Sequence, residues 1–403
     1  MSAKSPIKVS PLAPKVVPVL PAIEGVRLAT AAAGIRYKGR TDVLLALMDK
    51  GTAVAGVFTQ SKCPSAPVDW CRARLGRGVA RALVVNSGNA NAFTGKTGRQ
   101  STSLTASIAA KAAGCSLNEV FLASTGVIGH RVPVDKIERA MPELVSGLKE
   151  TGIAEAEEAI MTTDKMPKIA LSRGTIDGKE ITVCGMAKGA GMLAPQLATM
   201  LVVITTDAMI AAADLDTALR ASTRVSFDRL DSDGCMSTND QVSLLASGAS
   251  GVEPSLDSFT EVLTAVCLDL AEQLQGDAEG ASHDIRIEVV GAATEDDAVE
   301  VGRSVARNNL FKAAVFGNDP NWGRVLAAIG TTDAAFDPYD VDVSMNGVRV
   351  CHAGAPDRPR TDVDLSPRRV DLLIDLKSGQ HTATILTNDL THDYVHENSA
   401  YSS

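Results

Sequence analysis

Short apolar runs that contain many β-branched residues recur along the chain and predict β-strands. Runs of this length and composition are typical of strands with at least one buried face. The predicted strands are 80–86, 120–124, 168–176, 181–187, 200–206, 285–292, 348–352, 370–376 and 382–386.

Helical periodicity is clearest between Ser258 and Gln275. Apolar residues recur there every four positions, Ser258 and Glu261 have the spacing of an N-terminal capping box, and Gly276 follows as a stop. Further helices are predicted over 101–113, over 135–149 and from Thr294 onward.

This mixture of elements predicts an α/β (α+β) sandwich in which helical layers cover sheets. We expect an extended arm over residues 1–20, a large domain over 21–276 and a smaller C-terminal α/β domain over 277–403. Five prolines in the first 21 residues predict the extended arm, and they fit neither a secretory nor a transit peptide.

Composition and charge narrow the expected partners. An apolar content of 45% and a charged content of 22% are ordinary for a soluble globular protein. The net charge of −9 argues against nucleic acid, so small molecules are the expected partners. The apolar runs are too short to span a membrane. The seven cysteines form no CxxC pair, which predicts reduced thiols and a cytoplasmic location.

Two motifs suggest chemistry but have simpler explanations. Residues 90–97 fit a loose phosphate-loop pattern between a strand and a helix, which leaves a nucleotide-binding protein as an alternative. Ala90 replaces the leading glycine, however, and an Asn/Gly turn explains the segment more simply. His392 and His396 have the spacing of two zinc ligands on a helix, but two surface histidines in a tail are the simpler interpretation, and no metal is expected.

A third segment joins a loop of small residues to an apolar strand that begins at Thr199. The loop carries Lys188, Gly189 and Gly191, and its glycines let other backbone approach closely. Composition alone indicates a glycine-rich turn that leads into a buried strand.

This third segment, KGAGMLAPQLATML, resembles the self-cleavage segment of the ornithine acetyltransferase (glutamate N-acetyltransferase) family of arginine biosynthesis. The resemblance covers essentially the whole chain after the arm, and in this family the phosphate-loop candidate belongs to a pattern that binds no nucleotide. The matching motifs are NSGNANAFTG (86–95), STGVIG (124–129), IMTTD (160–164), FDRLDSDGCMSTND (227–240), VFGNDPNWGRVLAAIG (315–330) and ENSAYSS (397–403).

The resemblance implies an αββα sandwich similar to that of N-terminal-nucleophile hydrolases but with different connectivity. It also implies self-cleavage between Ala198 and Thr199. The resulting α chain (1–198) and β chain (199–403) would pair and associate as an α2β2 heterotetramer.

Threonine suits the role of a self-generated nucleophile. Its β-branch restricts the rotamers of the hydroxyl, and the small side chain of Ala198 leaves the preceding carbonyl open to attack. Cleavage then frees an α-amine with an ordinary pKa of about 8, which can take the proton of the Thr199 hydroxyl. One residue would thus supply both nucleophile and base.

The resemblance also implies the other site residues. Thr125 and Gly126 would form the oxyanion hole. One cation, one anion and neutral donors would serve the charged ends of both substrates, N2-acetylornithine and glutamate. The implied substrate-binding residues are Thr162, Lys188, Thr199, Glu279, Asn398 and Ser403. Outside this family, Lys188 and Glu279 would be ordinary surface charges.

The implied reaction is a ping-pong transfer of acetyl from N2-acetylornithine to glutamate through acetyl-Thr199, without a metal or organic cofactor. Whether acetyl-CoA also serves as an acetyl donor stays open. Two other classes remain as alternatives: a related self-cleaving aminopeptidase or amidase, and the phosphate-loop nucleotide-binding protein.

Overall fold

The computed structural model describes residues 20–193 and 200–400. Two sheets form the larger part of the molecule. In the first sheet, β4 and β5 run parallel and the other neighbours run antiparallel. Its strand order is β1 (Val26–Ala31), β2 (Val43–Met48), β4 (Ala82–Asn86) and β5 (Val120–Ser124).

The second sheet contains five strands, of which only β8 and β9 pair in parallel. In β8 every side chain is buried, as its continuous apolar and β-branched sequence predicts. The strand order is β3 (Ala53–Phe58), β9 (Gln241–Ala246), β8 (Leu201–Thr206), β7 (Lys179–Lys188) and β6 (Lys168–Ile176).

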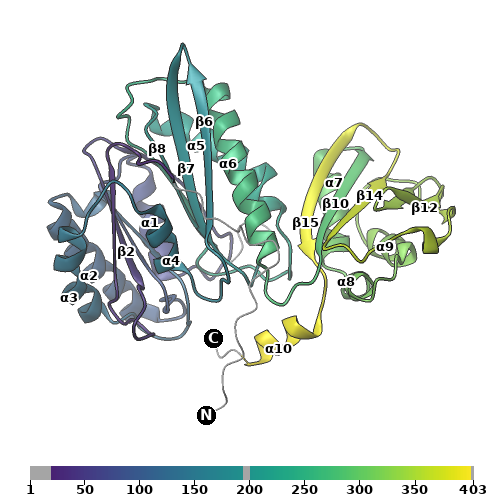
Figure 1. Cartoon of the computed structure of the whole chain (residues 1–403), viewed down its shortest axis with the longest axis horizontal. Helices are drawn as coiled ribbons and strands as arrows, with labels where there is room; N and C mark the ends of the chain where they lie inside the picture. Colours follow the sequence, from purple (N-terminus) through teal and green to yellow (C-terminus); the bar gives the residue numbers. More distant parts are fainter. Residues whose placement is uncertain (1–19, 194–199, 401–403) are drawn as a thin grey trace.

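The two sheets pack face to face between helical layers (Figure 1). Phe121 of the first sheet and Met186 of the second belong to one buried cluster between them. Helices α2 and α3 cover the outer face of the first sheet, and α5 and α6 cover that of the second. The predicted αββα sandwich is therefore confirmed. The helices of this part are α1 (Ala66–Leu75), α2 (Gly95–Ala113), α3 (Val134–Ser146), α4 (Ile153–Ile160), α5 (Ala212–Val225) and α6 (Leu256–Gly276), with 3-10 turns at Leu117–Glu119 and Phe227–Arg229.

A third sheet of six strands has its own buried cluster beneath α7, α8 and α9. Its elements are β10 (Asp284–Ala292), α7 (Glu295–Ala306), α8 (Asn309–Phe316), α9 (Trp322–Ile329), β11 (Asp342–Met345), β12 (Val348–His352), β13 (Ala355–Pro356), a 3-10 turn (Arg360–Asp362), β14 (Arg369–Asp375), β15 (His381–Asn388) and α10 (His392–Ala400). Its first strand, β10, follows the segment 277–283 that comes after α6 ends at Gly276. The division into domains at residue 276 stays a prediction.

The predicted start of the long helix is wrong by one turn. Ser255, not Ser258, is the N-cap of α6, because its hydroxyl accepts a hydrogen bond from the Ser258 amide at 3.2 Å. The cap predicted for α7 is confirmed, since the Thr294 hydroxyl accepts from the Asp297 amide at 3.0 Å. Both helices start where a short hydroxyl side chain satisfies a free backbone N–H.

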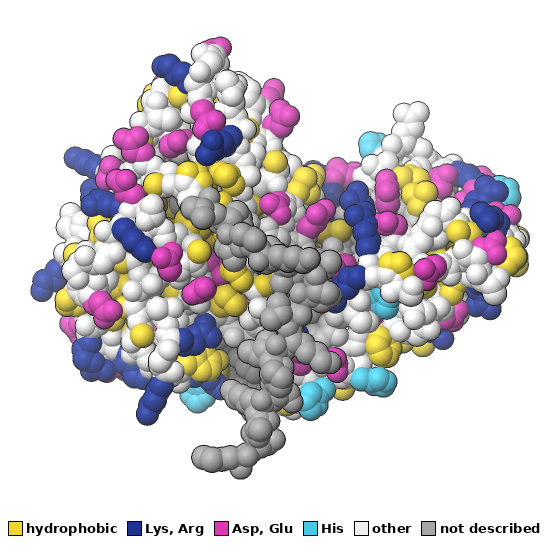
Figure 2. All heavy atoms as spheres, in the orientation of Figure 1, with side chains coloured by type: hydrophobic (Ala, Val, Ile, Leu, Met, Phe, Trp, Pro, Cys, Tyr) yellow, Lys and Arg dark blue, Asp and Glu magenta, His cyan; other side chains and the backbone are white. Residues whose placement is uncertain are grey.

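The surface carries charges of both signs. On the face shown in Figure 2, acidic and basic side chains are interspersed among the described residues, as is typical of a solvated surface. Among the described residues, no helix combines the length and apolar character needed to cross a membrane.

Gly185 in β7 allows α6 to pack closely on the second sheet. An added Cβ would lie 2.8 Å from both Leu270 Cδ1 and Val266 Cγ1. We expect Gly185→Ala to lower the free energy of unfolding by about 1–3 kcal/mol, measured by denaturant unfolding. The control Gly76→Ala, where nothing lies within 4 Å of the added Cβ, should change stability by no more than about 0.5 kcal/mol. Equal losses in both variants would contradict this explanation.

Candidate active site

Lys188 lies at the end of β7, opposite Leu201 at the start of β8. It is only 1% exposed and is therefore not the ordinary surface charge that it would be expected to be outside this family. The Lys188 Nζ atom lies 3.4 Å from the Thr125 hydroxyl oxygen and 3.7 Å from Asp164 Oδ2. A buried ammonium therefore stands beside the proposed oxyanion hole.

Asp164 connects several of the predicted site residues. Its carboxylate accepts the backbone N–H groups of Thr162 at 2.9 Å and Gly189 at 2.5 Å. It also pairs with the buried Lys168 at 2.8 Å. Burial alone would raise the pKa of Asp164, but Lys168 and Lys188 outweigh burial and lower it. Asp164 is therefore a fixed negative charge that orders the segments carrying Thr162 and Lys188.

The turn after β5 carries Thr125 and Gly126. The Thr125 backbone N–H donates to the Asn86 carbonyl at 3.0 Å, so only its side-chain hydroxyl is available for an oxyanion. Gly126 has a φ of +124°, and a Cβ there would lie 2.4 Å from the Gly88 carbonyl carbon. Only glycine fits such a close approach of two backbone segments.

Hydrogen bonds join the Asn-rich segment 86–91 to this turn. Ser124 donates to the Asn86 side chain at 2.6 Å, and the Ala90 amide donates to the Val127 carbonyl at 2.9 Å. The Asn91 backbone N–H donates to the side-chain oxygen of Asn89 at 2.8 Å. Two backbone donors that a phosphate would need are thus already used, which gives the phosphate-loop alternative no support.

Glu279 lies in the segment 277–283 between α6 and β10, which we call the Glu279 loop. Its backbone N–H donates to the Ala190 carbonyl at 2.8 Å, and a Cβ on Gly191 would lie 2.5 Å from Glu279 Oε2. Gly191 therefore makes room for a side-chain carboxylate, not for the backbone that the sequence predicted. Asn398 of α10 donates to the same Oε2 atom at 3.1 Å.

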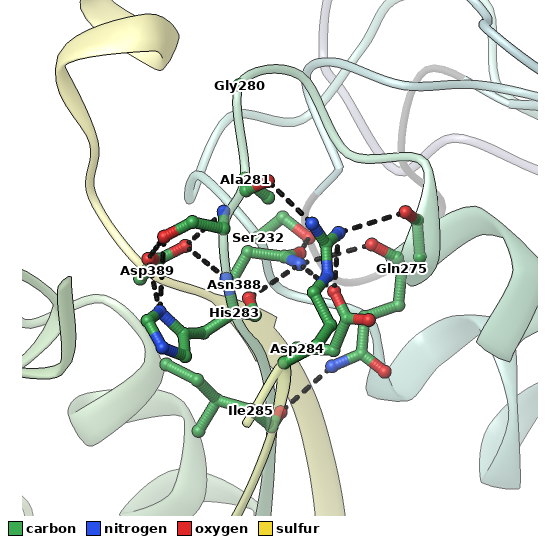
Figure 3. A network of polar contacts seen from close by, with 12 residues as sticks. Ser232, Gln275, Gly280, Ala281, His283, Asp284, Ile285, Asn388 and Asp389 are labelled. Atoms are coloured by element: carbon green, nitrogen blue, oxygen red, sulfur yellow. Dashed lines mark hydrogen bonds and ion pairs between the residues drawn. The ribbon is translucent and has the colours of Figure 1, made fainter. Parts of the chain in front are cut away.

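The Glu279 loop is held at both ends by a polar network (Figure 3). Arg368 donates to the carbonyls of Gly276 at 3.0 Å and Ala281 at 2.8 Å. Asp389 Oδ1 accepts the N–H groups of Ser282 and His283, each at 2.9 Å. These contacts join the loop to the third sheet.

Helix α10 packs directly on the Glu279 loop. Thr391 donates to the Gly280 carbonyl at 2.6 Å, and a Cβ on Gly280 would lie 2.2 Å from the Tyr394 amide nitrogen. Glu397 pairs with Lys165 at 3.0 Å. Helix α10 therefore contacts the larger part of the molecule, as the proposed role of Asn398 requires.

The start of β8 is tied to a second buried carboxylate. The amide of Met200 donates to Asp240 Oδ1 at 3.3 Å, and the neighbouring Asn239 side chain donates to the Ala90 and Ser124 carbonyls at 2.7 Å each. Burial raises the pKa of Asp240 well above its ordinary value. The position next to Thr199 thus lies close to the turn that carries Thr125.

Three predicted residues lie outside the described part of the chain: Ala198, Thr199 and Ser403. The described ones, Thr125, Gly126, Thr162, Lys188, Glu279 and Asn398, belong to contacting segments. The pair His392 and His396 lies exposed on α10, and no group of three potential metal ligands occurs among residues 20–193 and 200–400.

Four acidic and basic residues of this region were not predicted from the sequence. Asp164 and Lys168 are four positions apart, which in sequence resembles an ordinary exposed ion pair, and Asp277 and Asp240 sit in polar loops. One signal was available: Lys168 opens a run of apolar residues, an unusual place for an unpaired charge.

Comparison with known proteins identifies the family. The model of the ArgJ family matches residues 27–403. The arginine biosynthesis bifunctional protein ArgJ of Streptomyces avermitilis is 56% identical over 384 residues, which are 95% of this chain and 99% of the relative. The protein of the same name from Streptomyces coelicolor is 54% identical, with the same coverage of both chains.

The chain belongs to the ArgJ family. This confirms the resemblance inferred from the motifs and makes the chain an acyltransferase of arginine biosynthesis. Among solved structures, an ornithine acetyltransferase from Mycobacterium tuberculosis in complex with ornithine is 38% identical, covers 45% of this chain and 94% of its own, and has a TM-score of 0.39.

The pair of His283 and Asp389 predicts a pH-dependent stability. The Asp389 carboxylate, 2.8 Å from His283 Nδ1, raises the pKa of His283. A raised pKa in the folded state means that the pair stabilises the fold fully below the ordinary histidine pKa of about 6.5, and that this stabilisation is lost as pH rises through the raised pKa.

We therefore expect His283→Gln to lower the unfolding temperature at about pH 6 and to have a much smaller effect at about pH 9. His381→Gln, at an exposed position of β15, is the matched control and should show no such difference. An effect of His283→Gln that is equal at both pH values would contradict the charge-based explanation.

Proposed function

We propose that this ArgJ-family chain cleaves itself between Ala198 and Thr199 and then transfers acetyl from N2-acetylornithine to glutamate through an acetyl-Thr199 intermediate. The observation that supports this most is the buried contact between Lys188 and Thr125 beside the start of β8. It brings a cation and a hydroxyl donor next to β8, the strand that follows Thr199 in sequence.

The proposed chemistry needs an acceptor for negative charge. When the Thr199 hydroxyl attacks the acetyl carbonyl, the carbonyl oxygen becomes an oxyanion, and the Thr125 hydroxyl and the Gly126 N–H would donate to it. The Lys188 ammonium donates to the Thr125 oxygen, which polarises the hydroxyl and makes it a better donor. Fixed donors of this kind stabilise the transition state more than the ground state.

The substrates carry charges that match the described residues. Lys188 would bind a carboxylate, and Glu279 would bind the δ-ammonium of N2-acetylornithine. Glu279 is positioned for this by Asn398 and by the close approach to Gly191. After ornithine leaves, glutamate would enter the same site and its amine would attack the acetyl group. Thr162, whose backbone Asp164 anchors, would supply a neutral hydroxyl.

Several finer features of this proposal come from the family resemblance. These are the α2β2 assembly, the cytoplasmic location and the binding contribution of Ser403. Acetyl-CoA as a second acetyl donor accords with the word bifunctional in the names of the relatives.

Replacing Thr199 by Ala tests self-cleavage. We expect wild type to run as two bands near half of 42.0 kDa on a denaturing gel, and Thr199→Ala to run as one band of 42.0 kDa without transfer activity. The control Thr217→Ala, on the exposed surface of α5, should cleave and transfer normally. Intact wild type that transfers acetyl, or hydrolysis of N2-acetylornithine at a rate that glutamate does not change, would overturn the proposal.

Replacing Thr125 by Val tests the oxyanion hole, because valine keeps the shape and removes the hydroxyl. We expect kcat for acetyl transfer by the cleaved enzyme to fall by about 10²–10³-fold. Thr105→Val, which removes a buried hydroxyl in α2, should leave kcat within about threefold of wild type. Unchanged kcat in Thr125→Val would exclude its hydroxyl from transition-state stabilisation.

A further inference from the structure

Lys168 and Lys188 leave the second sheet on opposite faces. Lys168 in β6 lies opposite Ala187 in β7, so its side chain shares the face of Ala187, which packs under α6. Lys188 is the next residue after Ala187 and therefore points to the other face, toward Thr125. Two buried cations thus stand at the same sheet end but on different sides.

Asp164 lies at this sheet end and contacts both cations with different oxygens. Its Oδ1 atom is 2.8 Å from Lys168 Nζ, and its Oδ2 atom is 3.7 Å from Lys188 Nζ. The first distance is that of a charge-assisted hydrogen bond, whereas the second is too long for one. Asp164 is therefore committed to Lys168 and only loosely paired with Lys188.

Lys168 is fully satisfied by protein groups. Besides Asp164, its ammonium contacts Asp277 Oδ2 at 2.7 Å and the Met166 carbonyl at 3.2 Å. Those three acceptors use its three N–H donors. Lys188, in contrast, has only the Thr125 hydroxyl as a hydrogen-bond partner and the distant Asp164 oxygen as an ion-pair partner among the described residues. These two contacts do not use all three of its N–H donors.

A neighbouring carboxyl group does not replace Asp164 as a partner of Lys188. Glu157 of α4 is fully buried in the same region. Burial, together with the charge of Asp164, raises the pKa of Glu157 well above its ordinary value and favours its uncharged form. Burial likewise raises the pKa of Asp240, which interacts electrostatically with Lys188, well above its ordinary value. The charges to balance are thus two lysines and the two aspartates Asp164 and Asp277.

From this arrangement we propose that Lys168 is a positioning residue that engages Asp164, and so keeps Lys188 free to bind the carboxylate of the substrate. The inference rests on the proposed acetyl transfer and on the proposed role of Lys188. Without Lys168, Asp164 would be a buried carboxylate whose nearest cation is Lys188. Such a pair closes to direct contact, because an unpaired buried charge is costly. Lys188 would then be drawn away from Thr125 and from the substrate.

The test compares two donors, N2-acetylornithine and its methyl ester, which lacks the α-carboxylate charge. The measured quantity is the ratio of kcat/KM for the acid to kcat/KM for the ester. Wild type should prefer the acid by about tenfold or more, since a charge-assisted hydrogen bond distinguishes the two. A merely structural role of Lys168 would lower both rates together and leave the ratio unchanged.

The variants form a matched pair that differs only at Lys168. Asp277→Asn keeps the pair of Lys168 with Asp164 and should retain the preference for the acid. Lys168→Met/Asp277→Asn removes one positive and one negative charge, so the buried charge stays balanced, and its preference should fall to within about threefold. Lys168→Gln/Asp277→Asn is a second balanced variant with the same expectation, in case methionine prevents folding.

Lys312→Met is the control for the loss of any buried lysine. Lys312 is 5% exposed and donates to the Ser232 carbonyl, and among the described residues no hydrogen bond or ion pair joins it to Asp164 or Lys188, so this variant should keep the preference for the acid. If both balanced variants transfer acetyl and keep the preference, the role of Lys168 is overturned while the proposed function stands. If wild type transfers no acetyl to glutamate, the proposed function falls and this inference falls with it.

Discussion

The burial of two lysines at one end of a sheet is the constraint on which the site depends. A buried ammonium is tolerated only with acceptors close by, and here a single aspartate, Asp164, lies between the two. The contacts of Asp164 hold together the start of β6, the end of β7 and the segment around Thr162. Lys188 consequently lies beside Thr125, although 63 residues separate them in the chain.

The proposed site is assembled from parts of the chain that lie far apart in sequence. The first sheet supplies Thr125 on a turn that only Gly126 permits, and the second sheet supplies Lys188 and the strand after Thr199. The Glu279 loop and α10 close the site from the side of the third sheet, held by Arg368 and Asp389. The proposed catalytic and binding groups thus come from the first two sheets and from segments attached to the third.

Much of this organisation was predictable from the sequence. β-Branched runs located β5, β6, β8 and β10, but β2 and β9, which read VLLALM and QVSLLA, contain few such residues and were missed. The resemblance of motifs, and not the residue pattern alone, pointed to Thr125, Lys188 and Glu279, and their roles stay predictions. The position of Lys168 at the start of an apolar run indicated a paired charge, but its pairing with Asp164 was not predictable, because an i, i+4 pair of opposite charges has the same sequence whether it is exposed or buried.

Thr199 is proposed to carry the acetyl group between two amino acids, and the rest of the proposed mechanism depends on this step. The most direct measurement is the intact mass of the β chain after brief incubation of the purified enzyme with N2-acetylornithine in the absence of glutamate. The account predicts a β chain heavier by one acetyl group, carried on its first residue, that returns to its original mass when glutamate is added. Steady transfer to glutamate with no acetylated β chain at any time would contradict it.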